Sequence, residues 1–264
     1  MRSSDLVVLL TDFGTRDPYV ALMKGVLLGI HRRAMLVDLT HEIGPQDVAG
    51  AARLLRQAHP FFPDGTIFVC VVDPGVGTKR RIVGVETDRH RFLAPDNGLL
   101  GFLQEEGLVR RAVSIENRDF FRSEVSNTFH GRDVIAPAAG HLCSGLDLKH
   151  LGPAVRSIAT LPAEAAPDRR PDGSVAGRVV RIDRFGNLLT DIPMAMLKPL
   201  GPKARVKVGK RDVGPVRKTY GEAKPGEPVA VIDSSGFLEV AVNCGSAEAV
   251  LRARAGTAVR VSPE

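Results

Sequence analysis

A run of seven apolar or β-branched residues, 66–72, ends abruptly in an Asp-Pro-Gly-Val-Gly segment at 73–77. Apolar runs without alternation are typical of strands that are buried on both faces, as in parallel sheets. The proline and the two glycines predict a sharply shaped loop whose main chain a ligand can approach closely. Because ligands of open α/β sheets bind beyond the carboxyl ends of the strands, Asp73 is a candidate site residue. Asp-Pro-Gly is also ordinary turn chemistry, and a local turn capped by the aspartate is the alternative.

Strand and helix patterns alternate along the chain up to this loop. The predicted order is strand 6–10, helix 19–30, strand 34–39, helix 46–59 and strand 66–72, followed by a hairpin over 82–94. This alternation predicts an α/β fold with a mostly parallel sheet flanked by helices. Asp12 follows the first strand as Asp73 follows the third, and Asp17 is expected to cap the first helix ahead of Pro18.

The segment Asn127–Asp133 leads into an alanine-rich pattern that predicts a helix over 134–142. Thr128 or Asp133 is expected to cap this helix. His130 would then lie near a helix N-terminus, where the positive potential lowers the pKa of a histidine and favours anions nearby.

The composition changes after residue 160. Residues 161–173 are rich in proline, alanine and arginine without clear periodicity, and they predict a linker between a domain at 1–160 and a second domain at 174–264. Short strand patterns separated by glycine and proline turns predict that the second domain is a small β-barrel or sandwich. The strands expected there are 177–182, 204–208, 228–232, 237–242 and 258–261.

Asp183, Asn187 and Ser234 lie in loops that follow two of these strands. A nucleotide-type ligand could use Asp12 to accept hydrogen bonds from ribose hydroxyls. Asp183 and Asn187 would hold a cationic amine, and Ser234 would donate to a carboxylate. Each of these residues alone is more simply explained as a turn or cap residue, but their number at predicted strand ends favours a ligand site.

The composition limits the class of protein. The chain has 264 residues, 44% hydrophobic and 25% charged, which is ordinary for a globular protein with room for two domains. Its net charge of +6 is scattered in arginine pairs and it has no Trp, so nucleic-acid binding is not predicted. Three cysteines without a CxxC pair fit a reducing cytoplasm. The first apolar run is too short for a signal sequence or a membrane span.

Several familiar motifs are missing from the sequence. There is no GxGxxG after a strand and no Walker A loop, so binding of NAD or of ATP phosphates is not predicted. There is no GxSxG, so the nucleophile elbow of serine hydrolases is excluded. Asp12, Asp73 and His130 could together hold a metal, but no spacing of the HExxH kind supports one. Neither a metal nor another cofactor is therefore predicted.

Five segments, in order and across nearly the whole chain, resemble those of the S-adenosyl-L-methionine hydroxide adenosyltransferases, the hydrolytic relatives of the fluorinases and chlorinases. They are Thr11–Thr15, Asp73–Thr78, Ala94–Leu100, Asn127–Asp133 and Asp183–Asn187. The resemblance implies an N-terminal α/β domain, a C-terminal β-barrel, and a homotrimer with sites between neighbouring subunits. It also implies hydrolysis of S-adenosyl-L-methionine to adenosine and L-methionine.

The resemblance implies a role for individual residues. Asp73, Arg80 and His130 match the water-activating trio of the family, although the adjacent Arg81 leaves a one-residue ambiguity. The ribose-binding aspartate looks like Asp12. The remaining predicted substrate contacts are Phe13, Val76, Gly131, Asp183, Asn187 and Ser234. The halogenating relatives have an arginine after that serine, where this chain has Ser235, so the contact to the methionine carboxylate is expected to differ.

The chemistry of the trio favours the hydrolytic branch. A sulfonium is already a good leaving group, so the enzyme must supply a nucleophile in line with C5′, and water is a poor one at neutral pH. Asp73 and His130 could orient the water and take its proton, while Arg80 offsets the developing charge. A carboxylate beside a bound halide is unfavourable, because like charges repel each other in a poorly solvated pocket. The sequence leaves open which group takes the proton. A halide-dependent adenosyltransferase and a non-catalytic binding protein remain the alternatives.

Overall fold

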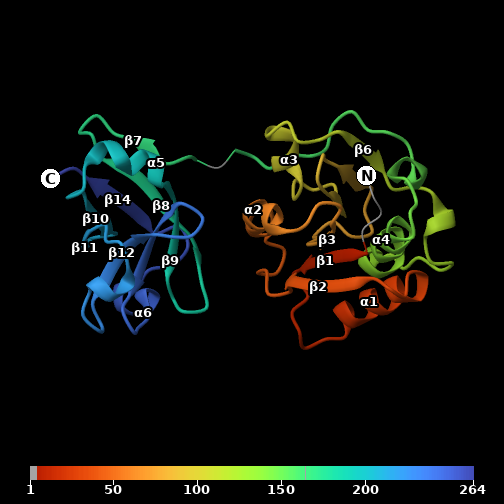
Figure 1. Ribbon diagram of the computed structural model, residues 1–264, viewed down its shortest axis with the longest axis horizontal. Helices are drawn as coiled ribbons and strands as arrows, with labels where there is room; N and C mark the ends of the chain where they lie inside the picture. The colour runs from red at the N-terminus through yellow and green to blue at the C-terminus, as the bar shows by residue number, and fades with distance from the viewer. Residues whose placement is uncertain (1–4, 164) are drawn as a thin grey trace. The chain divides into compact units, whose positions relative to one another are not determined.

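The computed structural model describes residues 5–163 and 165–264 of the chain. The chain divides into two compact units, Met1–Pro162 and Ala163–Glu264, and each is described here by itself (Figure 1). Among the described residues, none of the helices combines the length and the apolar character that crossing a membrane requires.

The first unit is built on one sheet whose strands are mostly parallel. Within residues 5–163 its six strands are β1 (Leu6–Thr11), β2 (Met35–Thr40), β3 (Ile67–Val71), β4 (Ile82–Glu86), β5 (Arg91–Pro95) and β6 (Arg111–Ser114). Their order in the sheet is β2-β1-β3-β5-β4-β6. The pairs β1–β2, β1–β3 and β3–β5 are parallel, whereas β4 runs antiparallel to β5 and β6. The predicted α/β fold with a mostly parallel sheet is confirmed.

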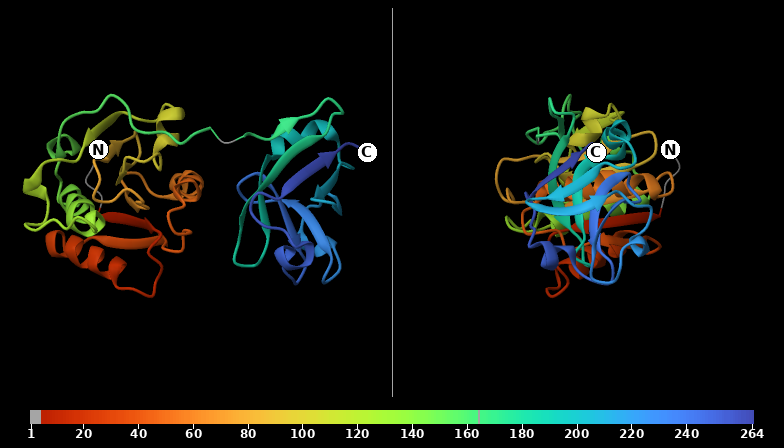
Figure 2. Two further views of the ribbon diagram at one scale, coloured as in Figure 1. Left: turned by 180° about the vertical axis from the view of Figure 1, so that it is seen from behind. Right: turned by 90° about the vertical axis from the view of Figure 1, so that its left-hand side faces the viewer.

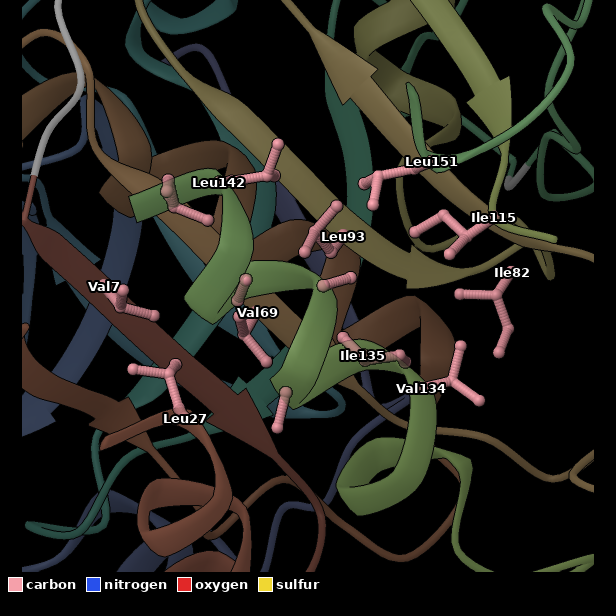
Figure 3. Close-up of a cluster of buried hydrophobic side chains, with 14 of the residues drawn as sticks. Val7, Leu27, Val69, Ile82, Leu93, Ile115, Val134, Ile135, Leu142 and Leu151 are labelled. Carbon is pink, nitrogen blue, oxygen red and sulfur yellow. The ribbon is translucent and has the colours of Figure 1, made fainter. Parts of the chain in front are cut away.

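Helices cover both faces of this sheet (Figure 1). The helices are α1 (Tyr19–Ile30), α2 (Val48–Ala58), α3 (Gly101–Glu105) and α4 (Ala136–Cys143), with short turns η1 (His59–Phe61), η2 (Arg118–Phe120) and η4 (Leu148–Leu151). One buried cluster joins Val7 and Val69 to α1 and α4, and Figure 3 shows Leu27 and Leu142 within it. The other buried cluster joins Val8 and Leu10 of β1 and Phe68 of β3 to α2 and α3. Successive strand residues point to opposite faces, so the continuous apolar runs fill two cores at once.

The strand order reverses direction at β1. The chain leaves β1 through α1 to reach β2 on one side, and then passes through α2 to reach β3 on the other side. Because α1 and α2 lie on opposite faces, the connections diverge beyond the carboxyl ends of β1 and β3. Such a switch point is where open α/β sheets bind their ligands.

Two predicted helix caps were wrong. Helix α1 has Pro18 rather than Asp17 at its N-cap, and no side chain caps it. The helix predicted over 134–142 is α4 at Ala136–Cys143, and a π-helical turn at Gly131–Ile135 (η3) precedes it. His130 is the N-cap of that turn and no side chain caps it, so Thr128 is not a cap either. Asp133 lies inside that turn and does not cap it, because its buried carboxylate accepts hydrogen bonds from the Arg122 and Arg132 side chains.

The second unit is a nearly closed antiparallel barrel (Figure 1; Figure 2). Its strands are β7 (Asp168–Arg169), β8 (Val175–Ile182), β9 (Leu188–Pro193), β10 (Arg205–Val208), β11 (Arg211–Pro215), β12 (Pro228–Ile232), β13 (Phe237–Val242) and β14 (Ala258–Ser262), with helical turns α5 (Met194–Leu197), η5 (Lys198–Leu200), η6 (Tyr220–Glu222) and α6 (Ala247–Leu251). The order is β11-β10-β14-β8-β9-β13-β12, and a bridge between Val216 and Ala230 joins the two ends. The predicted barrel is confirmed, although β7, β9 and β11 were not predicted. β7 lies within the expected linker 161–173 and pairs with β8.

A cluster of aromatic rings in the first unit encloses two histidines. The rings of His59 and His90 are 5.8 Å apart, and His90 packs 5.3 Å from Phe68. Burial lowers the pKa of His90 to about 4, and the charge of Arg89 acts in the same direction while Asp64 opposes it. Burial likewise lowers the pKa of His59. Both imidazoles are therefore neutral in the folded protein near pH 7.

We expect this cluster to make the first unit labile to acid. Below pH 6.5 the unfolded chain protonates His90 while the folded protein does not, so the free energy of unfolding falls as the pH falls toward about 4. The loss from this residue is at most about 3 kcal/mol. Denaturant unfolding at pH 7 and pH 4.5 should show a smaller pH effect in His90→Leu than in the unmodified protein. Equal pH effects in the two proteins would show that His90 does not contribute.

Candidate active site

A cavity of about 400 Å³ lies at the switch point, where Asp12 follows β1 and Asp73 follows β3. Six of the seven residues predicted for the site in this unit line it: Asp12, Phe13, Asp73, Val76, His130 and Gly131. The seventh, Arg80, is hydrogen-bonded to two of them. The structure therefore brings together residues from three separate stretches of the chain.

Arg80 joins Asp73 to His130. Its Nε donates to Asp73 Oδ1 at 2.7 Å, and its Nη2 donates to Asp73 Oδ2. The same Nη2 lies 3.0 Å from His130 Nδ1. The side chains of Arg80 and Asp73 are only 10% and 7% exposed, so this ion pair is largely shielded from water. A bidentate contact of this kind fixes the plane of the carboxylate as well as its distance from the guanidinium.

The loop after β3 folds back so that Arg80 can reach Asp73. Thr78 donates through both its main-chain nitrogen and its hydroxyl to the carbonyl of Gly75, at 3.1 and 2.7 Å. Gly77 has a φ of +77°, and a Cβ on it would lie 2.4 Å from the carbonyl oxygen of Asn127. Glycine is required there because it permits both the left-handed backbone and the close approach of the His130 segment.

Arg81 has a different partner, so the structure distinguishes which of the two neighbouring arginines contacts Asp73 and His130. Its Nη2 lies 2.6 Å from Asp96 Oδ2, and it also donates to the carbonyl of Ser157 at 3.2 Å. Arg81 thus ties the loop after β5 to the end of the first unit. Arg80 is the guanidinium that contacts Asp73 and His130.

His130 immediately precedes the π-helical turn of η3. Burial lowers its pKa, and the positive charge of Arg80 acts in the same direction, whereas Asp73 and Asp133 oppose the shift. Asp133 is itself fully buried and accepts from Arg132 Nε at 2.7 Å, which anchors the turn beneath His130. The imidazole is therefore neutral at pH 7 and held against Arg80.

Three aromatic rings pack together beside the cavity. Phe13, Tyr19 and Phe129 all line it, with ring centroids 5.4 to 5.7 Å apart. Of these, only Phe13 was predicted. Such a wall can hold a flat apolar base, and its ring faces attract cations. Tyr19 was assigned to the helix pattern and Phe129 to the segment before His130, and nothing in their spacing marked them as site residues.

A polar network behind the cavity positions the Asp12 loop. His41 Nδ1 lies 2.9 Å from Thr11 Oγ1, and its Nε2 lies 2.9 Å from Asp38 Oδ1. The carbonyl of His41 accepts from the main-chain nitrogen of Gly14 at 2.8 Å. Asp12 Oδ2 in turn accepts from the main-chain nitrogen of Gln46, whose φ is +64°. The position of the Asp12 carboxylate thus depends on the loop after β2, which the sequence did not indicate.

The second unit holds the three remaining predicted residues. Asp183 accepts from the main-chain nitrogen of Asn187 at 2.9 Å and from its Nδ2 at 3.1 Å, so these two residues are in direct contact. Ser234 lies exposed in the turn that Asp233 organises by accepting from the main-chain nitrogen of Ser235. Within the described residues, no group of three or more His, Cys, Asp or Glu is placed to hold a metal ion.

Negative charge gathers near these two loops. Glu239 on β13 is buried and accepts from the Tyr220 hydroxyl at 2.8 Å. Burial raises the pKa of Glu239, and the carboxylates of Asp183 and Asp233 add to the shift. The loops therefore present a surface that favours a cation. Glu239 was not predicted as a site residue because it lies in an otherwise apolar strand pattern.

The fold and the site together define an α/β protein that carries an Asp-Arg-His cluster at the switch point of its sheet. A family model described as the SAM hydroxide adenosyltransferase N-terminal domain matches residues 7–152, and the corresponding C-terminal domain model matches residues 177–260. The chain belongs to the SAM hydroxide adenosyltransferase family. The resemblance seen in the five sequence segments is thereby confirmed.

Individual relatives are similar over almost their whole length. The chain is 43% identical to the (R)-S-adenosyl-L-methionine hydrolase of Thermus thermophilus, covering 97% of this chain and 98% of that one. It is 28% identical to the fluorinase of Actinopolyspora mzabensis, with 98% of each chain covered. A crystal structure of an uncharacterized conserved protein from Thermotoga maritima matches with a TM-score of 0.90 and 38% identity, covering 97% and 99% of the two chains.

The two neighbouring arginines offer a matched test of the cluster. Lysine keeps the charge of Arg80 but cannot contact Asp73 through two nitrogens and His130 at the same time. We therefore expect Arg80→Lys to lower the turnover of S-adenosyl-L-methionine by roughly a hundredfold. Arg81→Lys, one residue away, should keep turnover within about twofold, because Arg81 contacts Asp96 instead. Steady-state kinetics on both variants would check this, and equal losses would contradict the distinction.

Proposed function

We propose that this protein hydrolyses S-adenosyl-L-methionine to adenosine and L-methionine through attack of an activated water on C5′. The observation that carries the proposal is the contact of Arg80 with both Asp73 and His130 at the edge of the cavity. Relatives from Thermus thermophilus and Salinispora tropica, 43% and 39% identical, are named (R)-S-adenosyl-L-methionine hydrolase and support it.

In this proposal the substrate is held at both ends. Asp12 accepts from the ribose hydroxyls, while Phe13 and its neighbouring rings face the apolar parts of the nucleoside. Asp183 and Asn187 hold the methionine ammonium, for which the negative charge near their loop is suitable. Ser234 donates to the carboxylate. Val76 and Gly131 shape the wall beside the reacting carbon.

The assembly and the setting are also part of the proposal. The family resemblance implies a homotrimer with sites between neighbouring subunits. In this proposal the domain at residues 1–160 carries the catalytic residues, the domain at 174–264 contributes to substrate binding, and residues 161–173 are the linker. A cytoplasmic setting is supported by the three cysteines, Cys70, Cys143 and Cys244, all of which are free thiols.

The hydrogen-bond pattern supports Asp73 as the group that takes the proton of the attacking water. A guanidinium only donates, so Arg80 Nη2 makes His130 Nδ1 an acceptor, and the neutral ring carries its proton on Nε2. His130 can then donate to the water oxygen but has no free site for its proton. Asp73 retains lone pairs beyond those used by Arg80 and accepts that proton. Arg80 offsets the negative charge of the nucleophile as the oxygen attacks C5′ and the bond to sulfur breaks.

A halide-dependent transfer fits the cavity less well. The Asp73 carboxylate lines the cavity and is largely shielded from water. A halide that gave up its hydration shell beside it would be repelled by a like charge. The fluorinase relatives are also more distant, at 28% identity and below. Water is therefore the nucleophile that the residues favour.

Incubation of the protein with S-adenosyl-L-methionine in water enriched in oxygen-18 would test the proposal. We expect adenosine that carries the label on its 5′ hydroxyl, as mass spectrometry would show, because water supplies that oxygen. Asp73→Asn should lower the rate by roughly a hundredfold or more while substrate binding stays largely intact. Binding without adenosine formation would indicate a non-catalytic protein, and chloride-dependent 5′-chloro-5′-deoxyadenosine would indicate a halogenating one.

The pH dependence of hydrolysis should reflect His130. Protonation at Nδ1 would place a proton against the Arg80 guanidinium and break their contact. Because the folded pKa of His130 lies below its usual 6.5, we expect kcat/KM to rise with pH through a midpoint below 6.5 and then to level off. His130→Asn, which keeps a donor and an acceptor but does not titrate, should lose this acid limb. An acid limb that persists unchanged in the variant would assign it to another group.

A further inference from the structure

A second cavity, of about 560 Å³, adjoins the Asp73–Arg80–His130 cluster. His130 lines both cavities, whereas Asp73 lines the first and Arg80 lines the second. The second cavity lies among the segment after Gly77, the end of β6 and the segment before His130. Nothing in the proposed hydrolysis uses it, although its volume is typical of small-molecule sites.

The rim of this cavity carries a net positive charge. Its lining includes five basic residues, Lys79, Arg80, Arg81, Arg118 and Arg122, and a single carboxylate, Glu116. Asp73, Asp96 and Asp133, which lie outside the lining, neutralise three of the guanidinium groups. Within residues 5–163 and 165–264, neither Lys79 nor Arg118 lies within ion-pair distance of a carboxylate. These two exposed cations leave the rim with an unbalanced positive charge.

The floor of the cavity is apolar. Ile82, Ile115 and Val134 line it, and Figure 3 shows these three side chains together at one end of the buried cluster. Phe121 and Val125 add further apolar surface to the lining. A cavity with an apolar floor and a cationic rim fits a ligand that has an uncharged body and an anionic end. A free inorganic anion would leave the floor uncovered.

We propose that this second cavity binds an organic phosphate and that binding slows the hydrolysis. The phosphate would contact Lys79 and Arg118, and the uncharged body of the ligand would cover Ile82 and its neighbours. Arg80 lies in the wall, so a bound phosphate competes with Asp73 for its guanidinium and weakens the contact that orients the water. Only this inhibitory part rests on the proposed function, because binding itself does not require turnover.

Uridine monophosphate is a suitable probe, because it lacks the adenosyl group that the substrate cavity is proposed to hold. Calorimetry with the full-length protein should show binding that weakens as salt is added. The double variant Lys79→Ala with Arg118→Ala should bind about tenfold more weakly or worse, since charged hydrogen bonds are lost. Lys210→Ala with Arg211→Ala removes the same charge from an exposed strand region of the second unit and should bind normally. If the double variant does not fold, Arg118→Gln alone carries the test.

Inorganic phosphate and uridine separate the two parts of the ligand. Both should bind more weakly than uridine monophosphate, since inorganic phosphate lacks the uncharged organic body and uridine lacks the charge. Equal affinity of inorganic phosphate would overturn the organic-phosphate assignment. So would an absence of binding at millimolar concentration, or unchanged binding in the double variant.

Kinetics test the inhibitory part separately. Uridine monophosphate should lower kcat without raising KM for S-adenosyl-L-methionine, and should have little effect on the double variant, which should retain basal turnover. A purely competitive effect would place the probe in the substrate cavity and overturn the proposal. Should the protein lack hydrolase activity, the calorimetric result still decides whether the cavity binds the probe.

Discussion

The contact of one guanidinium with a carboxylate and an imidazole organises the centre of the first unit. Arg80 reaches Asp73 seven residues earlier in the chain and His130 fifty residues later. The contact is largely shielded from water, so loss of any one partner would leave a charge or a polar atom poorly satisfied. It also makes His130 Nδ1 an acceptor, so that the neutral ring carries its proton on Nε2.

The sheet topology makes this contact possible. β1 and β3 are neighbours whose connections lead to opposite faces, so their carboxyl ends open into a space that no connection crosses. The loop after β3 and the segment at the start of the π-helical turn both line that space. Gly77 lets the two segments touch, because any side chain there would collide with Asn127. The second cavity, beside the cluster, is also formed where the loop after β3 approaches the segment before His130.

Much of the fold could be predicted because apolar runs and turn residues are local signals. The runs at 6–10 and 66–72 became central strands, and β12 and β13 have the predicted bounds. The misses have physical causes as well. β9 contains Asp191 and ends at Pro193, which weakens its strand pattern, and β11 begins with two charged residues. Asp133 looked like a cap, but its carboxylate is buried and paired with Arg132 beside it and with Arg122 eleven residues earlier, and burial is not a local signal.

The sequence by itself determined the class of fold, the glycine loop after β3 and the family resemblance, because each depends on residues that are adjacent or regularly spaced. Only the tertiary structure decided that Arg80, and not Arg81, contacts Asp73 and His130. It also revealed the His41 network behind Asp12 and the cationic cavity beside the cluster. The reason is that neighbouring residues on a loop point in different directions, and their partners come from strands and turns that only folding brings together.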